Sequence, residues 1–459
     1  MLLVLFIVVH CISLWQAQGL SCLFPTSPKQ LRVALRGANG VTISWRTSGY
    51  FGLNDTPYPQ VTYATSSTLL NAIYAPIGTS SSYDHTSFFH NVALLNLSSS
   101  TKYYYQIVAS SSCVLQSSIQ SFTTAPAPSS LTPVNISLVG DLGNDNLVNG
   151  GGASRTINAL FQAVQNTNFF IHSGDISYAD DYGLFVPFSF YEDTWNTWQN
   201  KMTGVTANNI YMTAPGNHEV TCFQEGDAFC LTTPYRKFSS YLNRFRMPGD
   251  ESGGYKNMWY SFDYGIVHVV IINTETDFLN APSGPGTTLN GGNFQGLTQQ
   301  QAWLESDLQA ANANRAQVPW ILVTGHRPFY GSLPQLPAVP GNCDACSTAF
   351  EPLIVKYNVD FYFCGHVHWY ERLYPIDANG NPLATNYNNQ SGPIHVTNGA
   401  GGAPEGKASV KKTISASAKI VSAYGYTRLE LKNASNARLS FIDSSTLQEA
   451  DSVDIVRYH

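Results

Sequence analysis

Five short apolar segments of the sequence each end in side chains that can bind a metal ion. They read VNISLVGD, NFFIHSGD, NIYMTAPGNH, VPWILVTGH and VDFYFCGHVH, in that order along the chain. Apolar runs of this length predict buried strands, and in α/β sheets binding sites form at the carboxyl ends of the strands. We therefore expect one shared site, built from the polar residues that end these segments: Asp141, Asp175, Asn217 with His218, His326, and His366 with His368.

The sequence changes in character at residues 125–133, which read APAPSSLTP and predict a linker. Before it, short β-branched and aromatic segments separated by turn residues predict an antiparallel β-sandwich. After it, apolar strands alternate with helical patterns, which predict an α/β domain whose last strands complete a second sheet. The predicted units are a signal peptide at residues 1–19, an N-terminal β-sandwich domain at 20–126 and an α/β domain at 133–459.

The first 19 residues, MLLVLFIVVHCISLWQAQG, have the pattern of a secretory signal peptide. An apolar run is followed by Ala17-Gln18-Gly19, a small-x-small cleavage site, although no Lys or Arg precedes the run. The alternative is a transmembrane anchor, but His10, Cys11 and other polar residues interrupt the run. We therefore predict cleavage and secretion, and the terminal DSVDIVRYH lacks the apolar tail of a lipid-anchor signal.

Cysteine usage agrees with export. Removal of the signal peptide with Cys11 leaves seven cysteines, and an odd number in an oxidising compartment implies a free thiol. A CxxC at Cys343 and Cys346 could also indicate a redox or zinc site, but the sequence has no second CxxC. Our hypothesis pairs Cys22 with Cys113, Cys222 with Cys230, and Cys343 with Cys346, and leaves Cys364 free.

Composition restricts the partners. Only 12% of residues are charged, the formal net charge is −6, and there is no run of Lys and Arg, so we expect no nucleic-acid partner. No later segment reaches the roughly 18 apolar residues of a membrane-spanning helix, so we expect no membrane partner. Asn-x-Ser/Thr sequences can accept N-glycans in an exported chain where they are exposed. They occur at Asn54, Asn96, Asn135, Asn389 and Asn433.

The polar blocks that end the five strands also resemble a known family. GDLG, GDISY, GNHE, VTGH and GHVH, which begin at residues 140, 174, 216, 323 and 365, are similar in order to the five blocks of the calcineurin-like metallophosphoesterases. The tyrosine of GDISY is similar to purple acid phosphatases, and the preceding sandwich resembles the two-domain members of plants and fungi. The implied fold is an α/β metallophosphoesterase sandwich of two mixed sheets flanked by helices, preceded by an all-β fibronectin-III-like domain.

The resemblance implies a secreted acid phosphatase that hydrolyses small phosphate monoesters. A hydroxide bound to a binuclear Fe(III)–M(II) centre would attack the phosphorus, and His218 would protonate the leaving group. M(II) would be Zn, Mn or Fe(II). Phenolate and carboxylate donors suit a trivalent ion, whereas imidazole and amide donors suit a divalent one. The implied ligands are Asp141, Asp175, Tyr178 and His368 for Fe(III), and Asp175, Asn217, His326 and His366 for M(II), with Asp175 bridging.

The chain departs from the plant enzymes at one point. Those enzymes carry extra histidines after the block that matches VTGH, and these histidines help to bind substrate. Here the segment HRPFYGSLPQLPAVPGNCDACSTAF contains no histidine after His326. Arg327 and Tyr330 are candidates for part of that role, and substrate specificity stays open.

The residues argue against two other functions. A phosphodiesterase or nucleotidase with two divalent metals has no use for a phenolate ligand, so Tyr178 argues against it. A non-catalytic surface glycoprotein has no use for a complete ligand set. Several further polar residues are expected to be structural: His172 packed in a strand, His268 in the core, and Tyr370, Glu371 and Arg372 in an ion pair. Asp180 and Asp181 are expected to be solvated loop residues, with contact to the site residues as the alternative.

Overall fold

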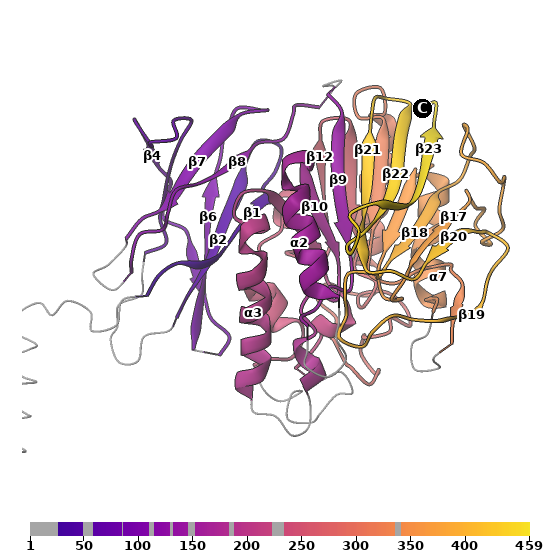
Figure 1. Ribbon diagram of the computed structural model, residues 1–459, viewed down its shortest axis with the longest axis horizontal. Coiled ribbons are helices and arrows are strands. Elements are labelled where there is room, and N and C mark those ends of the chain that lie inside the picture. The colour runs from indigo at the N-terminus through magenta and orange to yellow at the C-terminus, as the bar shows by residue number, and fades with distance from the viewer. Residues whose placement is uncertain are drawn as a thin grey trace, which may run out of the picture.

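The computed structural model describes most of the chain after the predicted signal peptide, which itself lies outside the described residues. Figure 1 shows a β-sandwich at one end and a larger α/β unit at the other. The described residues are 26–48, 58–84, 86–109, 114–128, 132–145, 152–182, 188–222, 234–335 and 341–459.

The N-terminal region forms two facing β layers around a core that contains Trp45, Tyr105 and Phe122. One layer has the order β4-β3-β7-β8, with β3 (Val61–Ala64), β4 (Ile73–Tyr74), β7 (Lys102–Ile107) and β8 (Gln120–Thr123). The other has the order β1-β2-β6-β5, with β1 (Lys29–Leu35), β2 (Val41–Ser48), β5 (Thr79–Ser81) and β6 (Ser87–Leu94).

The first sheet of the α/β unit continues directly from this sandwich. Strand β1 pairs in parallel with β11 at Val33 and Ile210, so a single ten-stranded sheet runs through both regions in the order β23-β22-β21-β9-β10-β11-β1-β2-β6-β5. The α/β strands of this sheet are β9 (Val134–Val139), β10 (Phe169–Ser173), β11 (Ile210–Ala214), β21 (Gly425–Leu431), β22 (Asn436–Asp443) and β23 (Glu449–Val456).

The second sheet has seven strands in the order β12-β13-β14-β16-β18-β17-β20. Four consecutive inner strands, β13, β14, β16 and β18, are parallel, and the fifth inner strand, β17, is antiparallel to its neighbours. A small ribbon, β15 (Leu333–Pro334) with β19 (Val410–Lys412), lies apart from it. The seven strands are β12 (Tyr260–Tyr264), β13 (Val267–Ile271), β14 (Trp320–Thr324), β16 (Phe361–Cys364), β17 (Tyr370–Leu373), β18 (Ile394–Asn398) and β20 (Ser417–Val421).

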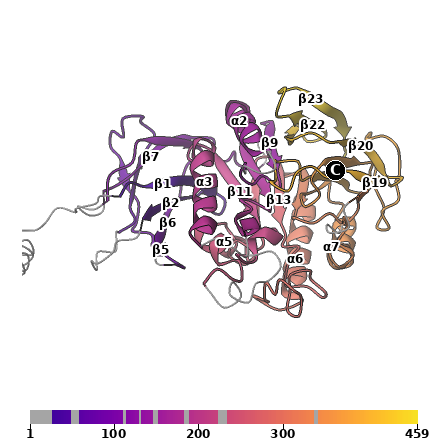
Figure 2. The same cartoon turned by 60° about the horizontal axis from the view of Figure 1, so that its bottom comes forward.

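Helices cover the outer faces of the two sheets. Figures 1 and 2 show α2 and α3 over the first sheet, and α6 and α7 side by side below the second. The α-helices are α2 (Ala153–Ala163), α3 (Phe188–Thr206), α5 (Ser239–Arg244), α6 (Gln299–Ala313) and α7 (Asp344–Lys356). Four 3-10 turns are η1 (Val164–Asn166), η2 (Ala179–Tyr182), η3 (Asn217–Glu219) and η4 (Asp250–Ser252).

The main core lies between the two sheets. The ring of Phe169 on β10 packs against Tyr264 of β12 across the interface, with 4.7 Å between ring centroids. Successive residues of β13 alternate, so Val269 joins this core while Val270 packs against the α6 and α7 side. Strands buried on both faces read as continuous apolar runs, which is why the sequence predicted them. The predicted fold class, a helix-flanked α/β sandwich behind an all-β domain, is confirmed.

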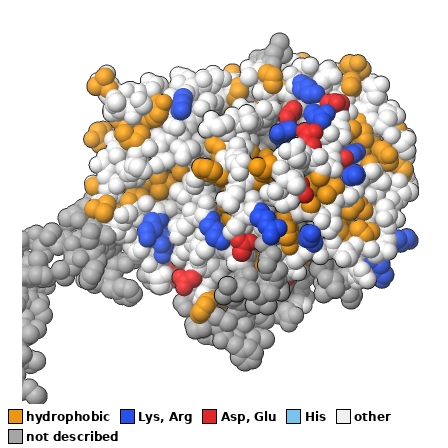
Figure 3. Space-filling model, viewed as in Figure 1, with side chains coloured by type: hydrophobic (Ala, Val, Ile, Leu, Met, Phe, Trp, Pro, Cys, Tyr) orange, Lys and Arg blue, Asp and Glu red, His pale blue; other side chains and the backbone are white. Residues whose placement is uncertain are grey.

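The face drawn in Figure 3 carries charges of both signs, and the densest group lies over β21–β23. There Arg428 and Arg438 pair with Glu449, and Lys432 pairs with Asp454. Within the described residues, no helix has the length and apolar character needed to cross a membrane.

The cysteine hypotheses are tested in part. Cys343 and Cys346 form a disulfide at the start of α7, and Cys364 is free and buried, both as predicted. Cys222 is also disulfide-bonded. Its predicted partner Cys230, and the predicted pair Cys22 and Cys113, lie outside the described residues.

The glycosylation sequences differ in exposure. Asn96, Asn389 and Asn433 are exposed, whereas Asn135 is only half-exposed and lies within strand β9. Asn54 lies outside the described residues. Among the acceptor sequences that the structure describes, these three asparagines are the exposed ones.

Candidate metal centre

The carboxyl ends of strands from both sheets meet at one place, and the predicted site residues lie there. Parallel strands present their carboxyl ends at the same edge of a sheet, so side chains that follow them converge. Asp141 follows β9, Asp175 follows β10, Asn217 and His218 open η3 after β11, His326 follows β14, and His366 and His368 follow β16.

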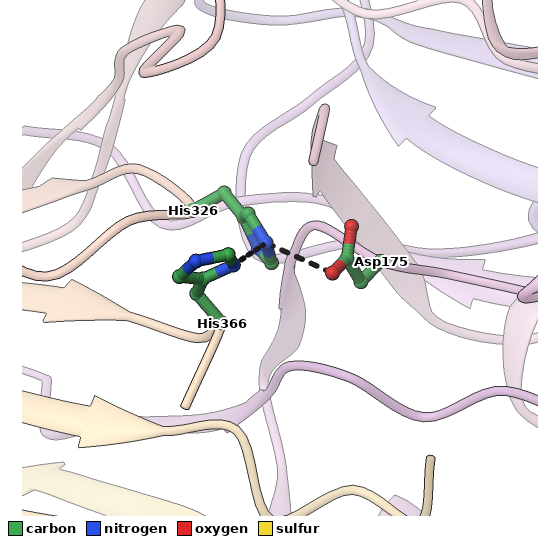
Figure 4. Close-up of side chains that lie close together, drawn as sticks. All are labelled: Asp175, His326 and His366. Atoms are coloured by element: carbon green, nitrogen blue, oxygen red, sulfur yellow. Dashed lines mark hydrogen bonds and ion pairs between the residues drawn. The ribbon is translucent and has the colours of Figure 1, made fainter. Parts of the chain in front are cut away.

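One cluster of donor atoms forms around His326. Its Nε2 lies 2.9 Å from Asp175 Oδ2, 3.0 Å from Asn217 Oδ1 and 3.2 Å from His366 Nδ1. Figure 4 shows His366 and Asp175 on either side of His326. One ligand atom from each of Asp175, His326 and His366 lies within 4.8 Å of the others, which is the spacing of a metal site. These four side chains are the ones predicted for M(II).

A second cluster forms around the hydroxyl group of Tyr178. This oxygen lies 2.9 Å from His368 Nε2 and 3.1 Å from Asp141 Oδ1, and His368 Nε2 lies 3.3 Å from Asp141 Oδ1. All three residues are buried. Together with Asp175, they are the residues predicted for Fe(III).

The backbone is bent at these residues. Asp141, Asp175, Tyr178 and His366 have φ values of 56°, 51°, 54° and 71°. Residues other than glycine rarely adopt this left-handed backbone conformation, which costs about 1–3 kcal/mol. It persists where surrounding contacts hold the backbone in place. Asp141, Asp175 and His366 lie just after the end of a strand, so the bend there turns the donor side chain into the site.

The motif glycines are required by close packing against the donors. A Cβ atom on Gly365 would lie 2.2 Å from Asp141 Oδ2, and one on Gly216 would lie 2.3 Å from Asp175 Oδ1. Real Cβ atoms do not approach so closely, so a side chain at either position would displace a carboxylate. Each of these glycines therefore leaves the space that a carboxylate from a different sequence block occupies.

Backbone amides hold the two carboxylates in place. The amide of His366 donates to Asp141 Oδ2 at 2.8 Å, and the amide of His218 donates to Asp175 Oδ1 at 2.9 Å. Each carboxylate keeps its other oxygen toward a donor cluster: Asp141 Oδ1 toward Tyr178 and Asp175 Oδ2 toward His326.

Glu219 is a residue that the sequence reasoning missed. Its carboxylate accepts the amide protons of Gly216 at 2.8 Å and of Asp175 and Ile176 at 2.9 Å each. It therefore ties the bend after β10 to the bend after β11. Burial and the nearby Asp175 carboxylate raise the pKa of Glu219 to about 8. The signal was its place in the GNHE block, directly after His218.

The three histidines are oriented in two different ways. Nδ1 of His326 lies 2.8 Å from the Ser173 carbonyl oxygen, and Nδ1 of His368 lies 2.8 Å from the Gly406 carbonyl oxygen. Donation of Nδ1–H to a carbonyl leaves Nε2 as the metal-binding nitrogen, which is the usual arrangement of a metal-binding histidine. His366 is reversed, because its Nδ1 faces His326 and its Nε2 lies 3.0 Å from Arg327 Nη1.

Electrostatics at the site favour a bound cation. Burial, together with the carboxylates of Asp141 and Asp175, raises the pKa of Tyr178 well above its usual value. A phenolate here therefore needs a nearby positive charge. Burial alone would lower the pKa of His326, but the Asp175 carboxylate raises it to about 9. Two buried carboxylates, a phenol, an amide oxygen and imidazoles are all metal-binding groups, so the residues fit a metal pair.

His218 lies beside this donor set and has its own carboxylate partners. Its Nδ1 lies 2.9 Å from Asp180 Oδ1 and 3.5 Å from Asp181 Oδ1, and its ring centroid lies 4.0 Å from that of Tyr178. Burial opposes a charge on the imidazole, but Asp180 and Asp175 raise the pKa of His218 well above its usual value. These carboxylates therefore favour the charged form of the ring.

Solvation of Asp180 in a loop is wrong, and the alternative prediction, contact with the site residues, is confirmed. Its carboxylate is buried and contacts His218, because η2 folds back over the bend after β10. Glu405 was also missed. Its two carboxylate oxygens each lie 3.9 Å from an Nε2 atom, one from that of His218 and the other from that of His368. The loop after β18 carries it there, and no motif in the sequence indicated this.

The remaining histidine and arginine predictions had different outcomes. His172 is packed in β10 beside the Tyr211 hydroxyl, and Arg372 pairs with Asp451, both as predicted. The prediction that His268 belongs to the core is wrong. Its side chain is 12% exposed and lies 2.7 Å from Asp263 of β12 and 2.9 Å from Asp307 of α6.

The comparisons with known proteins agree with this geometry. Residues 134–370 match the family model for calcineurin-like phosphoesterases. Residues 28–124 match that for the purple acid phosphatase N-terminal domain, and 392–452 that for the C-terminal part of iron/zinc purple acid phosphatase-like proteins.

Named relatives and a solved structure extend over nearly the whole chain. Acid phosphatase A of Cryphonectria parasitica is 32% identical over 95% of this chain and 92% of its own. Probable purple acid phosphatase 20 of Arabidopsis thaliana is 28% identical over 94% and 88%. The structure of a purple acid phosphatase from yellow lupin seeds shares the fold, with a TM-score of 0.75, 23% identity, and coverage of 95% of this chain and 76% of that one. This chain therefore belongs to the purple acid phosphatases, within the calcineurin-like phosphoesterases.

Proposed function

We propose that this protein is an acid phosphatase that hydrolyses small phosphate monoesters at a centre holding two metal ions. The observation that carries the proposal is the convergence of seven buried donor side chains from five strand ends in two sheets. Buried carboxylates, a phenol and imidazoles are costly to gather without a compensating charge. Family membership supports the same activity.

The two donor sets differ in the chemical character of their ligand atoms. The hard anionic donors Asp141, Asp175 and Tyr178, with His368, would hold Fe(III). The softer donors Asn217, His326 and His366, with Asp175 shared, would hold Zn(II), Mn(II) or Fe(II). When bound, such a pair supplies Lewis acidity to the phosphoryl group, lowers the pKa of the attacking water and leaves a net positive charge that attracts phosphate.

His218 would act as the general acid. Asp180 accepts its Nδ1–H, which fixes the ring and leaves Nε2 as the proton donor to the leaving oxygen. The raised pKa of His218 keeps this proton in place through the acidic range, in agreement with the family's acid activity. Glu405, at 3.9 Å from Nε2, lies where the leaving group would meet the imidazole.

Export of the protein is part of the proposal. The disulfide between Cys343 and Cys346 and the second one at Cys222 are typical of an oxidising compartment. Exposed Asn96, Asn389 and Asn433 would carry N-glycans. Treatment of protein secreted by a eukaryotic host with an N-glycosidase should lower its mass. An unchanged mass would argue against glycosylation.

The activity is tested with two matched substrates and a metal analysis. 4-Nitrophenyl phosphate should be hydrolysed fastest at acid pH, bis(4-nitrophenyl) phosphate much more slowly, and the active protein should contain two metal ions per chain. A preference for the diester, with two divalent ions, would instead support a phosphodiesterase. Active protein without metal would contradict the proposal.

A further inference from the structure

A buried ion pair lies directly beside the donor cluster. Arg327 follows the donor His326 in the chain, and its guanidinium contacts Glu275 through two bonds, Nε to Oε1 at 2.8 Å and Nη2 to Oε2 at 2.9 Å. Its third nitrogen, Nη1, lies 3.0 Å from His366 Nε2. The guanidinium is therefore fixed at the edge of the site.

Residues outside the donor cluster form hydrogen bonds with both Glu275 and Arg327. Ser283 donates its hydroxyl proton to Glu275 Oε2 at 3.0 Å. The Thr274 hydroxyl oxygen accepts the amide proton of Arg327 at 3.0 Å, and the Tyr362 hydroxyl donates to the Arg327 carbonyl oxygen at 2.7 Å. Side chain and backbone are thus pre-organised, so little conformational freedom would be lost when a ligand binds.

The guanidinium has donors left over. Arginine carries five N–H bonds, and the contacts with Glu275 and His366 engage three of them. One N–H on each terminal nitrogen has no bonded acceptor among the described residues. The Arg327 side chain is 8% exposed whereas that of Glu275 is fully buried, so solvent reaches the cation and not its counter-ion.

Orientation of His366 does not by itself explain this arginine. A metal-binding histidine is normally fixed by a hydrogen-bond acceptor, as Ser173 and Gly406 fix His326 and His368. A guanidinium is only a donor, so it cannot accept an N–H from the His366 ring as those carbonyl oxygens do for the other two histidines. A cation held at this position is better explained by an anion that it binds in the site.

We propose that Arg327 binds non-bridging oxygens of the substrate phosphoryl group and makes the site selective for dianionic monoesters over monoanionic diesters. The inference rests on the proposed phosphatase function. Two N–H donors on a planar guanidinium match two phosphate oxygens, and a monoester dianion offers one more terminal oxygen and one more charge than a diester. The two hydrogen bonds to Glu275 hold the guanidinium in the orientation that this contact requires.

The test uses two variants, because removing Arg327 alone would leave Glu275 buried without its counter-charge. In E275Q/R327Q both charges disappear together and the two amides can still hydrogen-bond. In R327K the charge remains but the fork geometry is lost. For each protein we would measure kcat/KM on 4-nitrophenyl phosphate and on bis(4-nitrophenyl) phosphate, the dissociation constant of inorganic phosphate by calorimetry, and the metal content.

The double variant should lose about 10- to 100-fold in kcat/KM on the monoester, the range for a lost charged hydrogen bond, and little on the diester. Phosphate affinity should fall by a similar factor, metal content should stay at the wild-type level, and R327K should lie between. Equal losses on both substrates together with loss of metal would overturn the proposal, because Arg327 would then act only through His366. Unchanged phosphate affinity would overturn it as well.

A matched control lies at the opposite end of the sheet. Arg315 Nη1 contacts Asp360 Oδ2 at 3.0 Å, and the two side chains are 9% and 0% exposed, close to the values of Arg327 and Glu275. R315Q/D360N should leave the substrate ratio and phosphate affinity unchanged. If the wild type hydrolysed neither substrate, the phosphatase proposal would fail, and the ratio of phosphate affinities between wild type and variant would still decide the role of Arg327.

Discussion

The two ends of the parallel strands bury charge in opposite ways. At the amino end, Asp360 precedes β16, and its carboxylate receives both Arg315 and the amide of Ile321. At the carboxyl end, Asp141, Asp175 and Tyr178 crowd together and the backbone is bent into the left-handed region at each of them. The amino end pairs its carboxylate with an arginine, whereas the carboxyl end gathers two carboxylates and a phenol among several imidazoles.

This difference indicates a structural role for the amino end of the strands and a functional role for the carboxyl end. At the amino end, Arg315 and the Ile321 amide both contact Asp360 Oδ2, so the loss of one partner would leave a buried charge uncompensated. At the carboxyl end, burial and nearby carboxylates raise the pKa of Tyr178, and burial and Asp175 raise that of Glu219. The charged forms of both groups are therefore disfavoured. Perturbed groups of this kind mark functional sites, and here a cation would relieve the conflict.

The largest effect is expected from removing the bridging donor. D175N should lower kcat below about one ten-thousandth of the wild-type value and release both metal ions, because it removes the carboxylate shared by both donor sets. Metal analysis and the rate on 4-nitrophenyl phosphate check this. H172N is the control, since His172 lies on the same strand and contacts Tyr211 instead. A D175N protein that keeps two metals would contradict the assignment.

Removal of the proposed general acid should separate chemistry from metal binding. H218N should lower kcat by about 100- to 10,000-fold while the metal content stays constant. The loss should shrink for substrates with good leaving groups, because these need no proton. A uniform loss across leaving groups would show that His218 acts only on structure.

At the amino end of the strands, a substitution should lower stability and leave activity unchanged. D360N removes the counter-charge of Arg315, which is only 9% exposed, and should lower the free energy of unfolding by about 3 kcal/mol. The kcat/KM value should not change. Urea unfolding and a steady-state assay on the same sample check both statements. A loss of activity without a loss of stability would break the comparison.

A smaller effect should appear in the pH dependence of stability. Burial would lower the pKa of His268, but hydrogen bonds to Asp263 and Asp307 raise it to about 9. Because the folded state holds this proton more tightly than the unfolded chain, the stabilisation is complete below pH 6.5 and is lost as the pH rises through 9.

Its size should be on the order of 2 kcal/mol, discounted for the partial exposure of the partners. Urea unfolding at pH 6 and pH 9.5 checks it, with H268Q beside the wild type. The two proteins should differ at pH 6 and converge at pH 9.5. Equal differences at both pH values would show that the contact does not involve a charge.

The sequence predicted features that depend on local pattern. Strands buried on both faces have uninterrupted apolar runs, so β9, β10 and β14 could be recognised, and the residue after each run could be assigned to a common edge. The blocks around Asp141 and Asp175 contain their own glycines, so donor and bend are specified together.

Features that depend on distant segments could not be predicted. Arg327 and Glu275 are 52 residues apart, and only the parallel pairing of β13 with β14 brings their loops together. Glu405 reaches His218 from a loop with no pattern of its own. The pairing of β1 with β11, which joins two regions into one sheet, is likewise a contact between edges that carry no complementary sequence signal.

The visible absorption spectrum of the purified protein, recorded beside that of Y178F, tests the central claim most directly. A phenolate bound to Fe(III) gives a charge-transfer band, so the wild type should be purple or pink. Y178F keeps the ring beside His218 but removes the oxygen that faces Asp141 and His368, so the band should disappear. A colourless wild type that holds two metal ions would contradict ligation by Tyr178 and would favour a pair of divalent ions.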